Sequence, residues 1–204
     1  MIATSRRYRK KIETRERILA AGIQIFSEKG IEQATVDEIA AAADVGKGTI
    51  YNYFETKEDI VVAFLVDIER KVQQEVGQLI SRRGTLESVL VAFLRFQFKL
   101  KESHHPFVRV FLAQMFSRAT AFSPWIQQLQ TVIDPPLYQL FSALQERGLM
   151  RPDVQVRDLV PIFKVIHLGL TALWAMEGSP WRQTERILKE EIRLFCKGLE
   201  ARGA

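Results

Sequence analysis

The chain has 204 residues, of which 47% are hydrophobic and 26% charged, which is typical of a globular protein with one compact domain and a smaller second one. Its single cysteine, Cys196, excludes a disulfide framework and favours a reducing cytoplasm. The basic run from Arg6 to Lys11 is not followed by an apolar segment, so no signal peptide is expected. The most apolar stretch, residues 159–176, is interrupted by a proline, a lysine and a histidine, which favours a buried helix over a membrane span.

The positive charge is concentrated at the N-terminus. Residues 1–17 hold seven basic and two acidic side chains, which accounts for the whole net charge of +5. A basic arm beside a neutral body is an expected feature of a protein that approaches phosphates. A solvated tail would have the same charge, so charge alone does not decide between the two.

The first half of the chain predicts four helices. The first begins at Thr14 as N-cap and ends near Lys29, with Gly30 as a left-handed stop. A capping box at residues 35–38 starts a short second helix that reaches about residue 43. The third covers residues 47–53, and the fourth starts with capping residues at 56–59 and reaches residue 79 or 80.

The rest of the chain also has helical periodicity, so the expected fold class is all-α, a three-helix head on a larger helical body. The further helices are predicted at residues 85–102, 106–119, 123–147, 156–177 and 182–200, with a kink or break at Pro135-Pro136. The domain prediction is a flexible basic arm at 1–13, a DNA-binding head at 14–56 and a ligand-sensing and dimerisation body at 57–204.

Two short helices joined by a tight turn, with a third covering their apolar side, form a helix-turn-helix. Ile39, Ile50 and Phe54 supply apolar contacts for Phe26 of the first helix, and alanines in the second helix allow close approach. Gly46 is expected to permit the turn.

The third helix has the composition of a surface that meets DNA. Within seven residues it holds Lys47, Gly48, Thr49, Tyr51, Asn52 and Tyr53. The four polar residue types bond phosphates or base edges, and Gly48 allows backbone approach. Thr35 and Lys57, each at a helix N-terminus, are expected to hold phosphates, and a lysine there opposes the helix dipole, which favours an anionic partner.

The head of the chain resembles the DNA-binding head of a known protein family. Residues 14–19, Phe26, Gly30 and Thr35-Val36-Asp37-Glu38-Ile39-Ala40 resemble the DNA-binding head of TetR/AcrR-type regulators. The stretch from Gly46 to Phe54, followed by Lys57-Glu58, resembles it as well. The resemblance covers about 45 residues in uninterrupted order; the other 140 or so share only length, helical content and a C-terminal apolar helix pair.

The resemblance implies roles for individual residues. Thr35, Lys57, Tyr51 and Tyr53 would anchor phosphates. Lys47, Thr49 and Asn52 would face the groove, with Lys47 reading guanine. Position 53 is often histidine in the family, and the tyrosine hydroxyl here reaches the same phosphate. Arg6, Arg7 and Arg9 are assigned to DNA from charge alone, either in a minor groove or along phosphates.

The body is rich in large apolar side chains, and the better interpretation of any single aromatic is core. Together they would also form an apolar ligand pocket, which the resemblance favours, since such regulators usually sense a small molecule that moves the fourth helix. The predicted lining residues are Phe93, Phe96, Phe111, Met115, Phe141 and Trp174. Arg95, Lys99 and Lys101 beside them hint at an anionic amphiphile or are simply solvated.

The last two helices are predicted to form the dimer surface, a four-helix interface as the family generally has. The predicted interface residues are Phe163, Ile166, Leu170, Leu188, Ile192 and Phe195. Two heads on a two-fold axis would read half-sites about 34 Å apart or a multiple of that. The expected partners are a palindromic operator, a small effector and a second copy, with no membrane, metal or cofactor.

Three other functions compete with this prediction. An enzyme is disfavoured because His104, His105 and His167 have no metal-ligand spacing and no phosphate-binding loop is present. An architectural DNA-coating protein would share the basic arm but would not need an aromatic body. Activation instead of repression stays open. The prediction is a cytoplasmic, dimeric repressor released from its operator by a largely apolar ligand.

Overall fold

The computed structural model of the chain describes residues 6–117 and 124–199. Throughout these ranges every regular element is a helix and no strand occurs, which confirms the all-α prediction. The elements are α1 (Arg6–Gln33), α2 (Val36–Ala42), α3 (Lys47–Tyr51), α4 (Lys57–Ser81), α5 (Leu86–Lys101), the 3-10 turn η1 (Glu102–His104), α6 (His105–Ser117), α7 (Pro124–Glu146), α8 (Val156–Glu177) and α9 (Arg182–Lys197).

The chain divides into two compact units that differ from the predicted domains. One comprises residues 1–67 with 106–129, so α6 belongs with the head; the other comprises residues 68–105 with 130–204. The boundary therefore falls inside α4 and not at its start. The sequence could not show this because α4 is one continuous amphipathic helix with no turn residues at the boundary.

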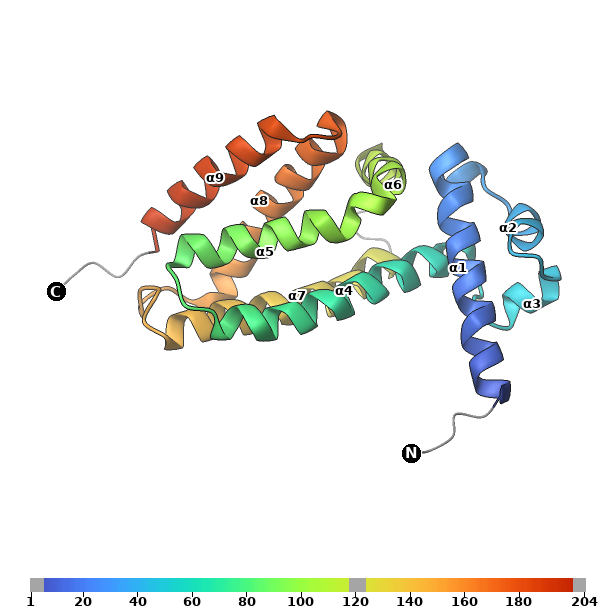
Figure 1. The fold of residues 1–204 in the computed structure, drawn as a ribbon, viewed down its shortest axis with the longest axis horizontal. Coiled ribbons are helices and arrows are strands. Elements are labelled where there is room, and N and C mark those ends of the chain that lie inside the picture. The colour runs from blue at the N-terminus through green and yellow to red at the C-terminus, as the bar shows by residue number, and fades with distance from the viewer. Residues whose placement is uncertain (1–5, 118–123, 200–204) are drawn as a thin grey trace. The chain divides into compact units, whose positions relative to one another are not determined.

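In the first unit, α1, α2 and α3 pack together (Figure 1) around buried Ile18, Phe26, Ile39 and Ile50. Gly22 of α1 faces α4, and a Cβ at Gly22 would stand 2.7 Å from Cγ2 of Ile60. Only glycine therefore allows α1 and α4 to approach this closely. The ring of Phe107 from α6 closes the same core, with its centroid 6.5 Å from that of Phe26 and 5.1 Å from that of Phe64.

The first helix differs from the prediction at both ends. It begins at Arg6 and not at Thr14, so described residues 6–13 of the predicted flexible arm are helical; residues 1–5 lie outside the described range. Thr14 is not an N-cap, because its hydroxyl donates to the Lys10 carbonyl one turn earlier, at 2.9 Å. The predicted stop at Gly30 is confirmed as a break, with φ 85°, after which helical hydrogen bonding resumes to Gln33.

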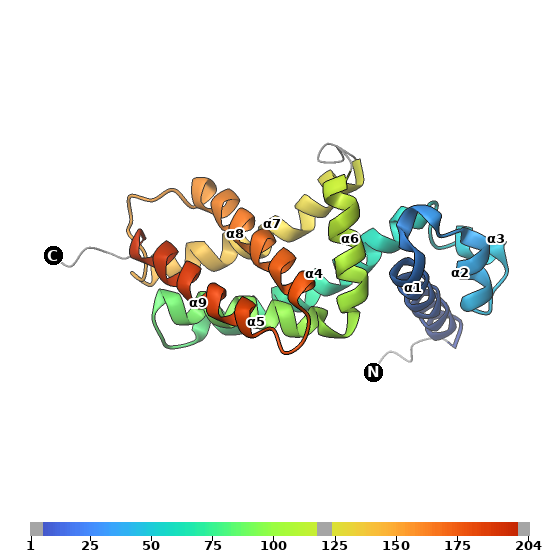
Figure 2. The same cartoon turned by 90° about the horizontal axis from the view of Figure 1, so that it is seen from above.

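In the second unit, α9 lies beside α8 and against α5 (Figure 2). The core of this second unit holds the rings of Phe93, Phe141 and Phe163. The centroids of the last two rings are 5.0 Å apart, and the rings meet edge to face. Arg147 donates to the carbonyls of Ile80 and Arg82 and so satisfies the C-terminal end of α4. The predicted break at Pro135-Pro136 is wrong, because α7 runs through both prolines as one helix.

Helix α8 is long and apolar enough to cross a membrane by length and composition, the one such helix among the described residues. A helix in the core of a globular protein can have the same length and composition. Lys164 of α8 forms an ion pair with Asp134 of α7, with Nζ to Oδ1 at 2.6 Å, and α8 packs on α5 and α9. The predicted buried helix is therefore buried on one side only, since 39% of its apolar window is buried inside the chain.

Candidate nucleic-acid interface

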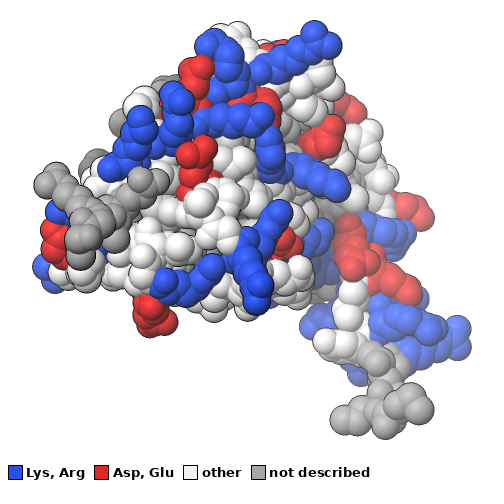
Figure 3. Space-filling view, turned by 60° about the vertical axis from the view of Figure 1, so that its left-hand side comes forward, with Lys and Arg blue, Asp and Glu red and all other residues white. Residues whose placement is uncertain are grey.

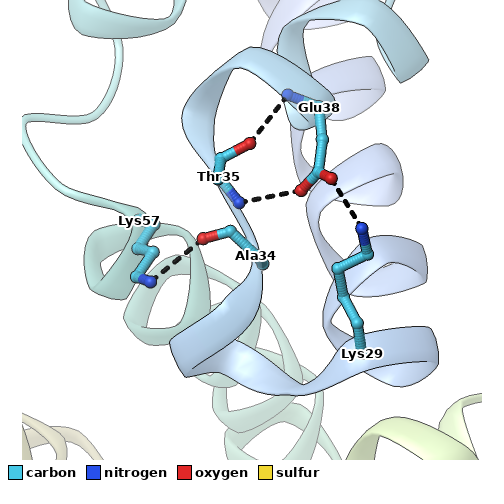
Figure 4. A network of polar contacts seen from close by, with 5 residues as sticks. All are labelled: Lys29, Ala34, Thr35, Glu38 and Lys57. Atoms are coloured by element: carbon cyan, nitrogen blue, oxygen red, sulfur yellow. Dashed lines mark hydrogen bonds and ion pairs between the residues drawn. The ribbon is translucent and has the colours of Figure 1, made fainter.

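The start of α2 is fixed by the predicted capping box (Figure 4). The Glu38 amide donates to Oγ1 of Thr35 at 3.3 Å, and the Thr35 amide donates to the Glu38 carboxylate at 3.0 Å. Lys29 donates to the other Glu38 oxygen at 2.6 Å. The ammonium of Lys29, with the Thr35 hydrogen bonds, holds the pKa of the Glu38 carboxyl at about 2. Thr35 itself is exposed at the helix start, where the prediction placed a phosphate.

The turn between α2 and α3 differs in one respect from the prediction. The left-handed residue is Asp44, at φ 50°, whereas Gly46 is extended, at φ −71°, and serves as the N-cap of α3. A Cβ at Gly46 would meet only Oγ1 of Thr49, at an ordinary 3.9 Å. The turn therefore does not require glycine at 46, and the small residue leaves the approach to α3 open.

Helix α3 presents its polar side chains outward. Lys47, Gly48, Tyr51 and Asn52 are exposed, with Tyr51 at 50%, and Thr49 and Tyr53 are half-buried. The inward positions, Ile50 and Phe54, are buried. The helix ends at Tyr51 with Asn52 as C-cap, two residues earlier than predicted, and the next two residues continue in a turn. Four of the six predicted α3 residues are thus exposed, and Thr49 and Tyr53 are partly accessible.

Lys47 already has a protein partner. Its Nζ donates to Oδ2 of Asp37 on α2 at 2.8 Å, and this hydrogen bond raises the pKa of Lys47. Both side chains are more than half exposed, so the pair is open to water and to ligands. The sequence prediction missed Asp37, because the two residues are ten positions apart on different helices.

Lys57, which was predicted to bind a phosphate, already has two partners within the protein. Its Nζ donates to the carbonyls of Glu32 at 2.7 Å and Ala34 at 3.0 Å, the second of which is drawn in Figure 4. The prediction took a cation at the start of α4 to imply an anionic ligand; instead the ammonium satisfies carbonyls after the Gly30 break. One N–H of three stays available for a phosphate.

The basic end of α1 is a second cationic surface. Arg6, Arg7, Arg9, Lys10 and Lys11 are all exposed, and Lys and Arg side chains gather at this end of the helix (Figure 3). Since residues 6–13 are helical, a cationic helix end replaces this part of the predicted flexible arm. Further along, Arg15 is used internally: it forms an ion pair with Asp67 at 3.0 Å and lies over the ring of Phe54.

Helices α2 and α3 are joined by a tight turn and pack with α1, and α3 is polar, accessible and partly cationic. This arrangement defines a helix-turn-helix DNA-binding domain. Residues 18–64 match the family model of bacterial regulatory proteins of the tetR family. The head of the chain is therefore a DNA-binding domain of the tetR family of bacterial regulatory proteins.

Curated relatives match mainly through this head. The chain is 45% identical over 64 residues to the transcriptional repressor BepR of Brucella suis, which covers 31% of this chain and 30% of BepR. It is 32% identical over 82 residues to the transcriptional regulator SrpR of Pseudomonas putida, or 40% of this chain and 38% of SrpR. The chain thus spans less than half the length of either relative that it matches.

The fold of the whole chain also has solved counterparts. The regulator FadR of Bacillus subtilis, solved in complex with stearoyl-CoA, superposes with a TM-score of 0.74 at 20% identity, covering 90% of this chain and 98% of FadR. At this low identity, the superposition shows that the two proteins share a fold, and it shows the fold alone.

The predicted ligand residues are divided between the two units. Phe93, Phe141 and Trp174 are fully buried, whereas Phe96 is half-buried; Phe111 and Met115 belong to α6 in the other unit. A cleft of about 390 Å³ lies in the second unit, lined by Arg95, Phe98, Lys99, Glu102, Trp174, Pro180, Trp181, Thr184 and Glu185. Trp174 is the one predicted residue in it.

The predicted dimer residues are mostly unavailable to a second chain. Phe163, Leu170, Leu188 and Ile192 are buried within the chain itself, and Ile166 and Phe195 are half-buried. Helix α8 has two apolar faces, and the sequence could not show which one packs internally. The exposed face is a different one, Ile162, Val165 and Met176 on α8 with Leu194 on α9.

The sequence prediction named Lys101 but did not bring it together with the other polar side chains that lie inside the second unit, from α4, α5 and α8. A signal for Gln97 was present, since it stands one turn before Lys101 on the same helix. Among the described residues, no three His, Cys, Asp or Glu side chains lie together as a metal site would require.

Proposed function

We propose that the protein is a transcriptional repressor that binds a palindromic operator as a homodimer and is released by a small, largely apolar ligand. One observation carries the proposal: α3 presents Lys47, Tyr51 and Asn52 outward while Ile50 and Phe54 anchor it from beneath. A short helix held in this way offers its polar side chains to a major groove.

The proposed contacts fall into two classes. Lys47 and Asn52 meet base edges with Thr49, and Gly48 allows the backbone to come close. Thr35, Tyr51, Tyr53 and the remaining N–H of Lys57 hold phosphates, as do Arg6, Arg7 and Arg9 of the basic helix. The name of BepR supports repression, and operator binding implies a cytoplasmic protein.

The proposed dimer uses the exposed apolar face rather than the residues first predicted. Ile162, Val165 and Met176 follow one side of α8, and Val165 is 72% exposed. Large apolar side chains in one stripe on a surface mark an interface. An isologous pairing of α8 and α9 across a two-fold axis would bury this face and relate the two heads as a palindrome requires.

The test is selection of bound sequences from random duplex DNA, followed by footprinting. We expect a single protected palindrome. Tyr51→Phe should weaken binding to the selected site and to unrelated duplex alike, because a phosphate contact is lost, whereas Tyr138→Phe, at an exposed tyrosine of α7, should change neither. Continuous protection at low salt without a selected sequence would contradict the proposal and indicate a DNA-coating protein.

A further inference from the structure

A buried polar cluster lies inside the second unit. It consists of Glu69 on α4, Gln97 and Lys101 on α5, and His167 and Thr171 on α8. Gln97 is 3% exposed, Thr171 6% and Glu69 8%, whereas Lys101 and His167 are half-buried. Gln97 precedes Lys101 by one turn on α5, as His167 precedes Thr171 on α8. The two helices pack together, and Lys101 and His167 meet across this packing.

The cluster does not satisfy its own hydrogen-bonding groups. Nζ of Lys101 lies 3.5 Å from Nε2 of His167. This long contact takes up one of the three N–H groups of the lysine. The Thr171 hydroxyl donates to the His167 carbonyl at 2.7 Å. Oε1 of Gln97 is sealed from solvent and has no partner among residues 6–117 and 124–199. A buried polar atom without a partner costs about 1–3 kcal/mol.

Burial acts on each titratable group of the cluster. It raises the pKa of Glu69 to about 7, although the nearby Lys101 opposes this, and it lowers the pKa of Lys101 to about 8. Burial and the charge of Lys101 together hold the pKa of His167 well below its usual value. At neutral pH, Lys101 is therefore still mostly a cation, His167 is neutral, and Glu69 is only partly ionised.

Helix packing alone does not explain these residues. Apolar side chains of similar volume would join the helices as well or better, since isolated buried charges destabilise a fold. The surroundings are apolar: the rings of Phe93 and Phe163, one turn before Gln97 and His167, stand 6.1 Å apart. Perturbed and unsatisfied groups in such a setting are typical of a binding site.

We infer that the buried polar cluster binds the head group of the effector and that this head group is a carboxylate. The inference rests on the proposed function and adds the ligand's chemical class. Lys101 supplies the pairing cation, and the protonated form of Glu69 donates a hydrogen bond to the anion. A half-turn of the Gln97 amide exchanges its unpaired oxygen for N–H donors. A cationic head group would instead meet the ammonium of Lys101.

The experiment uses the full chain and three probes of matched length: octanoate, 1-octanol and octylammonium. Calorimetry and thermal unfolding should show binding of octanoate, with 1-octanol and octylammonium at least about tenfold weaker, because only the carboxylate pairs with Lys101. Equal binding of the three probes, or no binding of octanoate, would overturn the inference.

Variants separate the cluster from the rest of the body. Lys101→Met should weaken octanoate about 30-fold or more while leaving 1-octanol unchanged. Gln97→Leu, which removes the unpaired amide, should weaken octanoate and not 1-octanol. Lys197→Met, at an exposed lysine of α9, is the matched control and should bind octanoate like the wild type. Octanoate binding that survives Lys101→Met would place the carboxylate elsewhere.

DNA binding is measured in parallel, so that two failures are distinguishable. Octanoate that binds through Lys101 without changing operator affinity would support the head-group site and contradict its role as effector site. Operator binding without selective carboxylate binding would leave the proposed repressor in place and remove the inferred ligand class.

Discussion

Nζ of Lys47, the residue proposed to read a base, donates to Oδ2 of Asp37 at 2.8 Å across the helix-turn-helix. The pair holds the lysine at the start of α3 before DNA is present. It also means that a base or phosphate competes with a carboxylate for the same ammonium, and that Asp37 places a negative charge beside the proposed interface.

Removing Lys47 should therefore weaken DNA binding, and removing the charge of Asp37 should strengthen it. Lys47→Ala should weaken the selected operator about tenfold or more and relax the preference at one base position. Asp37→Asn should strengthen binding to operator and unrelated duplex, because a repulsive charge is lost. Quantitative gel shifts at fixed salt measure both. An unchanged base preference in Lys47→Ala would place the lysine outside the groove.

A second prediction concerns Lys57, which donates to two carbonyls after the Gly30 break. Lys57→Met should lower the free energy of unfolding by about 1 kcal/mol, since charge-assisted hydrogen bonds are lost from a partly exposed position. DNA affinity should fall as well. Urea unfolding of Lys57→Met is compared with that of Lys99→Met, at an exposed lysine of α5. Unchanged stability with reduced affinity would return Lys57 to a purely phosphate-binding role.

Much of the head was predictable from sequence because its determinants are local. The capping box of Thr35 and Glu38 and the inward positions Ile50 and Phe54 depend on spacing within a few residues. What the sequence missed depends on tertiary contacts. Lys57 meets carbonyls more than twenty positions away, and the two apolar faces of α8 are equivalent until α5 and α9 cover one of them.

Close packing of α1 on α4 gives a third prediction. Gly22→Ala places a Cβ 2.7 Å from Cγ2 of the buried, β-branched Ile60, which has little freedom to move. We expect a loss of about 1–2 kcal/mol in the free energy of unfolding, after the gain in helix propensity is included. Gly77→Ala is the matched control in α4, where the Cβ meets nothing within 4 Å, and it should stabilise by up to about 1 kcal/mol.

The buried polar cluster gives a fourth prediction, on pH. The pKa of Glu69 rises from 4.5 to about 7 in the folded chain, so between these values the folded state keeps a proton that the unfolded state has released. Stability contributed by protonated Glu69 is therefore lost as pH rises through this window, by up to roughly 3 kcal/mol. Lys101 from α5 and His167 from α8 share the cluster, and lowered pKa values give both the opposite sign.

Glu69→Gln should remove this loss, so the variant gains stability relative to wild type as pH is raised from about 5 to about 8. Urea unfolding at several pH values measures the difference, in which the other titrating groups largely cancel. Glu75→Gln on the same helix is the control. A difference between Glu69→Gln and wild type that does not vary with pH would show that Glu69 titrates normally.

The exposed face of α8 gives the last prediction. Val165→Glu places a charge in the middle of the stripe formed with Ile162 and Met176, at a position that is 72% exposed. The folded chain should therefore keep its helical content and thermal stability as a monomer, while dimers dissociate, because an unpaired carboxylate cannot be buried between copies. Sedimentation measures the mass, and gel shifts should show loss of palindrome binding with weak half-site binding retained. Gln74→Glu, an equal change of charge at an exposed site on α4, is the control and should stay dimeric. If Val165→Glu remains a dimer, the two copies meet through another surface, and the α8 stripe then awaits a different partner.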